Sequence, residues 1–133
     1  MADLKMLAID LGASSGRGIV GSYDGEKLTL RENHRFPNEP VTVGNTFSWD
    51  ILRIYHEILQ ALRTCALGED RDIASVGIDT WGVDFGLLDA GGRLLANPVH
   101  YRDARTVGVP RRAYEVMSRS EVYDITGLQT NDF

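Results

Sequence analysis

Hydrophobic and polar positions along the first third of the chain alternate too quickly for a helix. The apolar run at residues 4–9 predicts a buried strand, and residues 17–23 read as a second one. A tight turn at residues 24–26 precedes partial two-residue alternation over residues 27–36, which predicts a third strand. Residues 37–44, punctuated by prolines, are expected to form a loop.

The period then changes to that of an amphipathic helix ending near Gly68. Ser48 or Asp50 is available as its N-cap. Apolar residues recur at steps of three and four, as expected for a face packed on a sheet: Ile51, Ile54, Tyr55, Ile58, Leu62 and Cys65. The single cysteine excludes an internal disulfide and is expected to be a buried thiol.

A continuous apolar run at residues 73–80 predicts a strand that is buried on both faces and parallel to the first. Residues 85–88 and 93–95 predict two further paired strands, and short helices are expected around 110–118 and 121–126. The predicted fold class is α/β, with a mixed sheet whose first three strands are antiparallel, flanked by helices. This order is typical of the ribonuclease-H-like domains of actin, hexokinase and heat-shock ATPases, and residues 1–133 are expected to form one such domain.

Composition narrows the classes of partner. The formal net charge is −5 and no basic run is present, which argues against nucleic acid as the main partner. No apolar run approaches the ~20 residues that span a bilayer, and the N-terminus lacks a signal-like apolar region. The chain is therefore expected to be cytoplasmic, without a membrane partner.

The turn between the first two strands is the first candidate site. Main-chain N–H groups of Gly12–Gly16 can converge on an anion, and Ser14 and Ser15 add hydroxyl donors. Arg17 adds a cationic fork, and Asp10 can hold a hydrated Mg²⁺ beside phosphates. The pattern lacks the lysine and following helix of a P-loop, and also the glycine spacing of a dinucleotide fingerprint. The alternative is an ordinary hairpin with a glycine-rich turn.

A second constellation ends the predicted parallel strand. Asp79 and Asp10 are expected to face one crevice, because the carboxyl ends of neighbouring parallel strands open onto the same side. Trp81 and Gly82 would supply an apolar wall and close backbone approach for a sugar ring. The alternative makes Asp79 a turn cap and Trp81 a core aromatic residue, and Asp84 only a partner of loop amides.

A third constellation places an aromatic ring beside an ion pair. Tyr101 with Arg102 and Asp103 suits a polyol clamp, in which the ring covers the apolar face of the substrate and the charges bind its hydroxyls. The alternative is a solvated, charged loop. The three histidines show no metal-ligand spacing, so no metal cage is expected, and His56 is interpreted as structural.

Together these motifs resemble the FGGY carbohydrate kinases, and within that family its rhamnulokinase branch. The match covers about Leu4 to Phe133, with residues 10–17, 77–85 and 101–106 as its most specific parts and 123–129 as a further family segment. The resemblance implies transfer of the γ-phosphoryl group of ATP to O1 of L-rhamnulose, with Mg²⁺ held by Asp10 through water. It also implies that Gly82 contacts the sugar. The residues implied to bind ATP phosphate are Gly12, Ala13, Ser14, Ser15, Gly16 and Arg17.

The resemblance also predicts what this stretch lacks. In the family the general-base aspartate and the adenosine pocket lie in a second domain, so the chain is interpreted as a truncated N-terminal half. We expect it to phosphorylate nothing alone and to self-associate through the surface left by the missing domain. The alternatives are a kinase of another ketose or deoxysugar such as fuculose or xylulose, a ribonuclease-H-like nuclease, and a non-catalytic sugar- or nucleotide-binding module.

Overall fold

The computed structural model describes residues 3–131, which form two compact units. The first unit comprises the residues up to Pro40 together with Trp49–Gly82. The second comprises Val41–Ser48 together with the residues from Val83 on. The single domain expected from the sequence stays a prediction.

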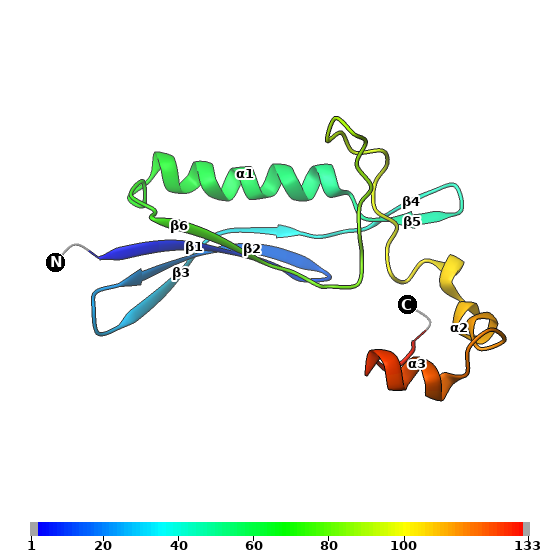
Figure 1. The fold of residues 1–133 in the computed structure, drawn as a ribbon. Coiled ribbons are helices and arrows are strands. Elements are labelled where there is room, and N and C mark those ends of the chain that lie inside the picture. Colours follow the sequence, from blue (N-terminus) through cyan, green and yellow to red (C-terminus); the bar gives the residue numbers. More distant parts are fainter. Residues whose placement is uncertain (1–2, 132–133) are drawn as a thin grey trace. The chain divides into compact units, whose positions relative to one another are not determined.

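A four-stranded mixed sheet forms the first unit (Figure 1), in the order β3-β2-β1-β6. β1 (Leu4–Leu11), β2 (Ser15–Tyr23) and β3 (Leu28–Pro37) are successively antiparallel, and β6 (Ser75–Asp79) joins β1 in parallel. The predicted strands and the parallel pairing are confirmed. β1 runs one residue beyond Asp10, which the sequence placed at its end.

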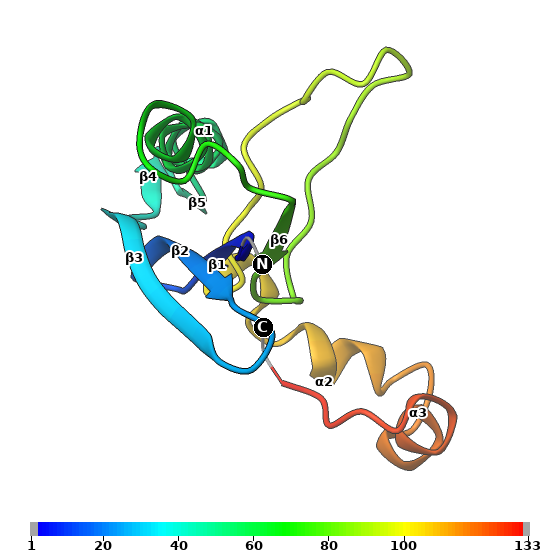
Figure 2. The same cartoon turned by 90° about the vertical axis from the view of Figure 1, so that its left-hand side faces the viewer.

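Helix α1 (Ile51–Leu67) lies along one face of this sheet (Figures 1 and 2) and packs over β2 and β3. The side chain of Asp50 accepts a hydrogen bond from the N–H of Arg53 and so caps the helix, as predicted. The core between helix and sheet contains Leu7, Ile9, Val20, Ala61 and Cys65, so the buried-thiol prediction is confirmed.

The predicted apolar stripe of α1 is wrong at one position, Tyr55. Tyr55 is 61% exposed, and the nearby polar residue Glu57 is buried in its place. The reason is a polar contact with β3: the Glu57 carboxylate pairs with His34, at 2.6 Å, and with Arg53. A paired carboxylate can lie under the helix where a hydrophobic pattern alone would place an apolar residue.

The prediction that β6 is buried on both faces is also wrong for this unit. Val76 and Ile78 stand in register with Leu7 and Ile9, and thus on the same face of the sheet. Leu7 and Ile9 are each 1% exposed, whereas Val76 is 48% and Ile78 58% exposed. The reason is that α1 covers the β2–β3 side of the sheet and leaves β6 at its edge.

The second unit contains elements that the sequence interpretation missed. β4 (Val41–Val43) and β5 (Thr46–Ser48) form a hairpin where a loop was expected, and Gly44 turns it with φ of 61°. The predicted strands at 85–88 and 93–95 reduce to one isolated bridge between Leu88 and Leu94. The short 3₁₀ helix η1 (Ala104–Thr106), α2 (Val109–Ala113) and α3 (Arg119–Thr126) follow, and α3 begins with a capping box at Ser118. Within residues 3–131 no helix is long and apolar enough to cross a membrane.

Candidate functional site

The turn between β1 and β2 is short and tightly closed. The N–H of Gly12 donates to the carbonyl of Ser15, at 2.9 Å. A Cβ atom on Gly12 would lie 2.9 Å from that same oxygen, so close backbone approach is what requires glycine here. Ala13 and Ser14, at the tip, are exposed. The tip therefore presents main chain and a hydroxyl to solvent, which are the groups that a phosphate-binding turn needs.

Asn38, which follows β3, supports this turn from beneath. Its N–H donates to the carbonyl of Ser14 at 3.0 Å, and its side-chain amide donates to the carbonyl of Gly12 at 2.8 Å. Only 3% of Asn38 is exposed. Sequence reasoning missed this residue because it lies in a proline-flanked segment, 26 residues after Gly12. A buried amide beside a loop is visible only once strand pairing is known.

A row of four charged residues crosses the sheet on the face opposite α1. By strand register Asp79 stands beside Asp10, Asp10 beside Arg17, and Arg17 beside Arg35. Residues in register on neighbouring strands project from the same face, so two acids and two bases lie side by side. The sequence-based expectation that Asp10 and Asp79 share one face follows directly from this register.

Within the row, Arg17 binds Asp10. Its Nε and Nη2 atoms lie 2.8 and 2.7 Å from the same carboxylate oxygen, Oδ2. The two side chains remain 44% and 37% exposed. The residues expected to bind phosphate and a hydrated cation therefore pair with each other in this structure.

The donor set at this place suits a hydrated Mg²⁺. Asp10 and Asp79 supply carboxylate oxygens, and Mg²⁺ usually keeps several waters and takes only one or two carboxylates. Among residues 3–131 no group of three His, Cys, Asp or Glu residues could form a metal cage. A cation held through water beside Asp10 fits these residues.

Gly16 of the motif and Gly18, which follows it, are explained by packing on the α1 face. A Cβ atom on Gly16 would lie 2.1 Å from the ring of Phe36, which is itself 3% exposed. A Cβ atom on Gly18 would meet the side chain of Asn33 at 2.4 Å. These glycines thus admit neighbouring side chains beneath the strand, and the opposite face carries the charged row.

Trp81 and Gly82 follow the end of β6 in different environments. The ring of Trp81 stacks on that of Trp49, with centroids 4.2 Å apart, and Trp49 is 1% exposed. Gly82 is exposed, and a Cβ atom there would meet nothing within 4 Å. Trp81 is therefore anchored by an aromatic partner, as its core alternative anticipated, while the backbone at Gly82 stays accessible. Their predicted sugar contacts stay predictions.

Tyr101, Arg102 and Asp103 belong to the second unit. The guanidinium of Arg102 lies over the Tyr101 ring, 5.2 Å from its centroid, and that ring stacks on buried His100. Both carboxylate oxygens of Asp103 accept main-chain hydrogen bonds, from Phe47 at 2.7 Å and from Arg105 at 2.9 Å. These bonds lower the pKa of Asp103. Asp103 thus fixes its loop to β5, and its predicted sugar contact stays a prediction.

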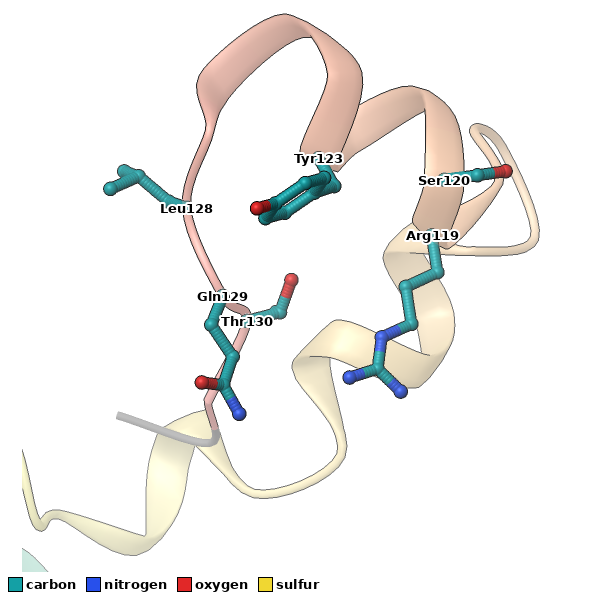
Figure 3. Close-up of a pocket in the computed structure, with 6 residues that line it drawn as sticks. All are labelled: Arg119, Ser120, Tyr123, Leu128, Gln129 and Thr130. Carbon is teal, nitrogen blue, oxygen red and sulfur yellow. The ribbon is translucent and has the colours of Figure 1, made fainter.

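A cavity of about 600 Å³ lies beside α3 (Figure 3). Its lining comes from α3 and the segment after it: Arg119, Ser120, Tyr123, Leu128, Gln129 and Thr130. The Leu128 side chain points away from the other labelled groups. None of the residues that the sequence marked for phosphate, metal or sugar lines this cavity, so it is not the candidate site.

Comparison with known proteins identifies the family. Residues 5–133 match the profile of the FGGY family of carbohydrate kinases, N-terminal domain. The chain belongs to this family. Curated relatives include rhamnulokinases from Bacteroides thetaiotaomicron, 50% identical over 97% of this chain and 26% of that protein, and from Oceanobacillus iheyensis, 45% identical over 96% of this chain and 27% of that protein.

Solved structures of carbohydrate kinases confirm the predicted fold class. The crystal structure of gluconate kinase from Lactobacillus acidophilus superposes with a TM-score of 0.74 at 13% identity, covering 92% of this chain and 25% of that one. At that identity the likeness shows the fold alone. The FGGY chain described here spans about a quarter of the length of the curated relatives that it matches.

Proposed function

We propose that this chain is the N-terminal part of a two-domain FGGY kinase that transfers the γ-phosphoryl group of ATP to O1 of L-rhamnulose. The observation that carries the proposal is the 50% identity to a rhamnulokinase over 97% of the chain. The geometry at the β1–β2 turn supports it, since a small, main-chain-rich loop stands next to a carboxylate pair.

In this proposal the turn from Gly12 to Arg17 holds the ATP phosphates. Main-chain N–H groups and the hydroxyls of Ser14 and Ser15 donate to phosphate oxygens, and Arg17 offsets the charge that spreads over the transferring group. A bound Mg²⁺ would supply positive charge that offsets the charge of the phosphates. Asp10 holds it through water, with Asp79 beside it.

Sugar recognition in this proposal falls to the residues that the sequence motifs marked for it. Gly82 lets the substrate approach the main chain, and Trp81 and Tyr101 offer ring faces. Asp79, Arg102 and Asp103 are the polar partners. The base that accepts the proton from O1 is expected in the second domain, so residues 1–133 alone would not catalyse transfer. Phosphoryl transfer depends mainly on alignment and charge stabilisation, which is the part these residues contribute.

The test measures ADP formation by the full-length protein with a panel of sugars: L-rhamnulose, fuculose, xylulose and glycerol. We expect kcat/KM to be highest for L-rhamnulose. A higher kcat/KM for another ketose would show that the proposed substrate is wrong but that the proposed reaction, phosphoryl transfer from ATP to a sugar, is right. No sugar-dependent ADP formation, together with nicking of plasmid DNA, would favour the nuclease alternative, and binding without turnover would favour a binding module.

The role of Asp10 is tested in the same assay by its dependence on Mg²⁺. Asp10→Asn is expected to raise the Mg²⁺ concentration needed for half-maximal rate by about 10–100-fold, the usual effect of losing an outer-shell partner. Asp72→Asn is the control, because Asp72 is an exposed partner of Lys5 outside the charged row. Equal Mg²⁺ dependence in both variants would contradict the role of Asp10.

A further inference from the structure

We propose that Asn38 is a positioning residue for the phosphate-binding turn and sets the direction of its main-chain donors. The inference rests on the proposed function for the identity of its ligand, a nucleoside triphosphate. Asn38 lies outside the sequence motif of residues 10–17. The pairing of β3 with β2 brings it next to the turn.

Two hydrogen bonds from one residue fix two different peptide groups of the turn. The Asn38 side chain holds the Gly12 carbonyl, and the Asn38 main chain holds the Ser14 carbonyl. The donor of both bonds is buried, because Asn38 is only 3% exposed. Burial makes the loss of either donor costly for the carbonyl left behind.

The direction of the carbonyls determines the direction of the donors. In a trans peptide the C=O of one residue and the N–H of the next point to opposite sides. No peptide bond within the described residues is cis. The N–H groups of Ala13 and Ser15 therefore point away from Asn38. By holding both carbonyls on its own side, Asn38 keeps these oxygens from repelling an anion and leaves the amide protons to meet it.

The side chain and the main chain of Asn38 contribute separately, so substitution isolates one of them. The main-chain bond to Ser14 persists in any variant other than proline. Asn38→Asp keeps the shape but places a carboxylate oxygen against the Gly12 carbonyl, which turns attraction into repulsion. Asn38→Ala removes the donor without adding that repulsion and is expected to have a smaller effect.

Asn33 provides a matched control. It lies on β3, shortly before Asn38 in the chain, is partly buried and, like Asn38, donates its side-chain amide to a main-chain carbonyl, that of Ala61, at 3.1 Å. This bond joins the sheet to α1 and does not involve the turn. Asn33→Asp should therefore lower thermal stability in the same way as Asn38→Asp without changing the binding of nucleotide.

The experiment compares full-length wild type, Asn38→Asp, Asn38→Ala and Asn33→Asp. Calorimetry gives the Kd of ATP, steady-state kinetics give KM for ATP and for L-rhamnulose, and thermal unfolding gives Tm. We expect Asn38→Asp to raise both the Kd and the KM of ATP about tenfold, as for loss of one buried hydrogen bond. Asn38→Ala should show a smaller rise. KM for the sugar should be unchanged, and Asn33→Asp should bind ATP like wild type.

The outcomes separate this inference from the proposed function. ATP affinity that is equal in wild type and both Asn38 variants would overturn the positioning role, whatever happens to Tm. An equal loss of ATP affinity in Asn33→Asp would overturn it too, because the effect would then be general destabilisation. The variants and wild type could differ in ATP affinity as expected while wild type phosphorylates no sugar. That result would refute the proposed function and leave this inference standing. A wild type without ATP affinity would refute both.

Discussion

Glu57 is an acidic residue in a buried environment. It is 4% exposed on α1, yet it carries a charge because His34 on β3 and Arg53 one turn earlier both pair with it. Burial alone would raise the pKa of Glu57, but the hydrogen bond with His34 and the charge of Arg53 outweigh it and lower that pKa. Helix and sheet are thus joined by the Glu57–His34 hydrogen bond as well as by the apolar core.

Stability should therefore depend on the ionisation of Glu57. Because folding lowers the pKa of Glu57, its ionisation stabilises the folded protein at pH values above 4.5, the ordinary pKa of a glutamate. This stabilisation is lost as the pH falls through the pKa of Glu57 in the folded state. Glu57→Gln is expected to lower the free energy of unfolding by about 1–3 kcal/mol at pH 7. Urea unfolding from pH 7 to pH 3 should show a shallower acid loss for the variant.

Glu32→Gln is the control for that prediction. The Glu32 carboxylate pairs with Arg35, 2.6 Å away, but both side chains are more than 40% exposed. Exposed pairs contribute roughly 0–1 kcal/mol, so this variant should stay close to wild type. Equal losses in the two variants would show that burial of Glu57 has no energetic consequence.

At the scale of elements, Gly16 on β2 makes room for the side chain of Phe36 on β3. The Phe36 ring occupies the space that a side chain at Gly16 would need. Glycine in a strand usually weakens it, but here it allows a large buried ring to close the end of the sheet next to the turn. The shape of the turn thus depends on packing beneath it as well as on its own residues.

Gly16→Ala should therefore act through overpacking. The added methyl group would overlap the ring of Phe36, and we expect a loss of about 1–3 kcal/mol in the free energy of unfolding. Phe36→Leu introduced into the Gly16→Ala variant should recover part of this loss. Calorimetric melting of the single and double variants measures both effects. A Gly16→Ala protein as stable as wild type would contradict the tight packing at this contact.

Elements with a clear period were predictable, and those held by distant contacts were not. The three antiparallel strands and α1 follow from apolar runs and from two- and three-to-four-residue spacing, and the parallel pairing of residues 73–80 follows from their continuous apolar run. The β4–β5 hairpin was missed because its strands are three residues long and lie beside Pro40. The site divides in the same way: the motif marked Asp10 and Arg17, but neither their mutual pairing nor Asn38 has a local signal.

At the scale of the molecule, β6 carries an exposed apolar strip at the edge of the sheet. Val76 and Ile78 extend the buried row of Leu7 and Ile9, but they are 48% and 58% exposed. Two adjacent aliphatic side chains about half exposed on a strand at the sheet edge favour association with another apolar surface or strand.

Residues 1–133 produced alone should therefore self-associate. Sedimentation velocity is expected to show a weight-average mass that rises with concentration. Val76→Lys together with Ile78→Lys should shift the distribution toward monomer, because charge on an edge strand opposes pairing. A chain that remains monomeric at all concentrations, or a double variant that associates like wild type, would contradict the role of this strand.

The Arg17–Asp10 contact has a consequence for the order of events at the turn. One guanidinium cannot give the same N–H groups to a carboxylate and to a phosphate. If Arg17 binds phosphate as proposed, an arriving nucleotide would compete with Asp10 for these groups. Once displaced, the acid has lost its neutralising neighbour and attracts a hydrated cation more strongly. Binding of nucleotide and binding of magnesium would thus favour each other, and the Arg17–Asp10 ion pair would form only while both are absent.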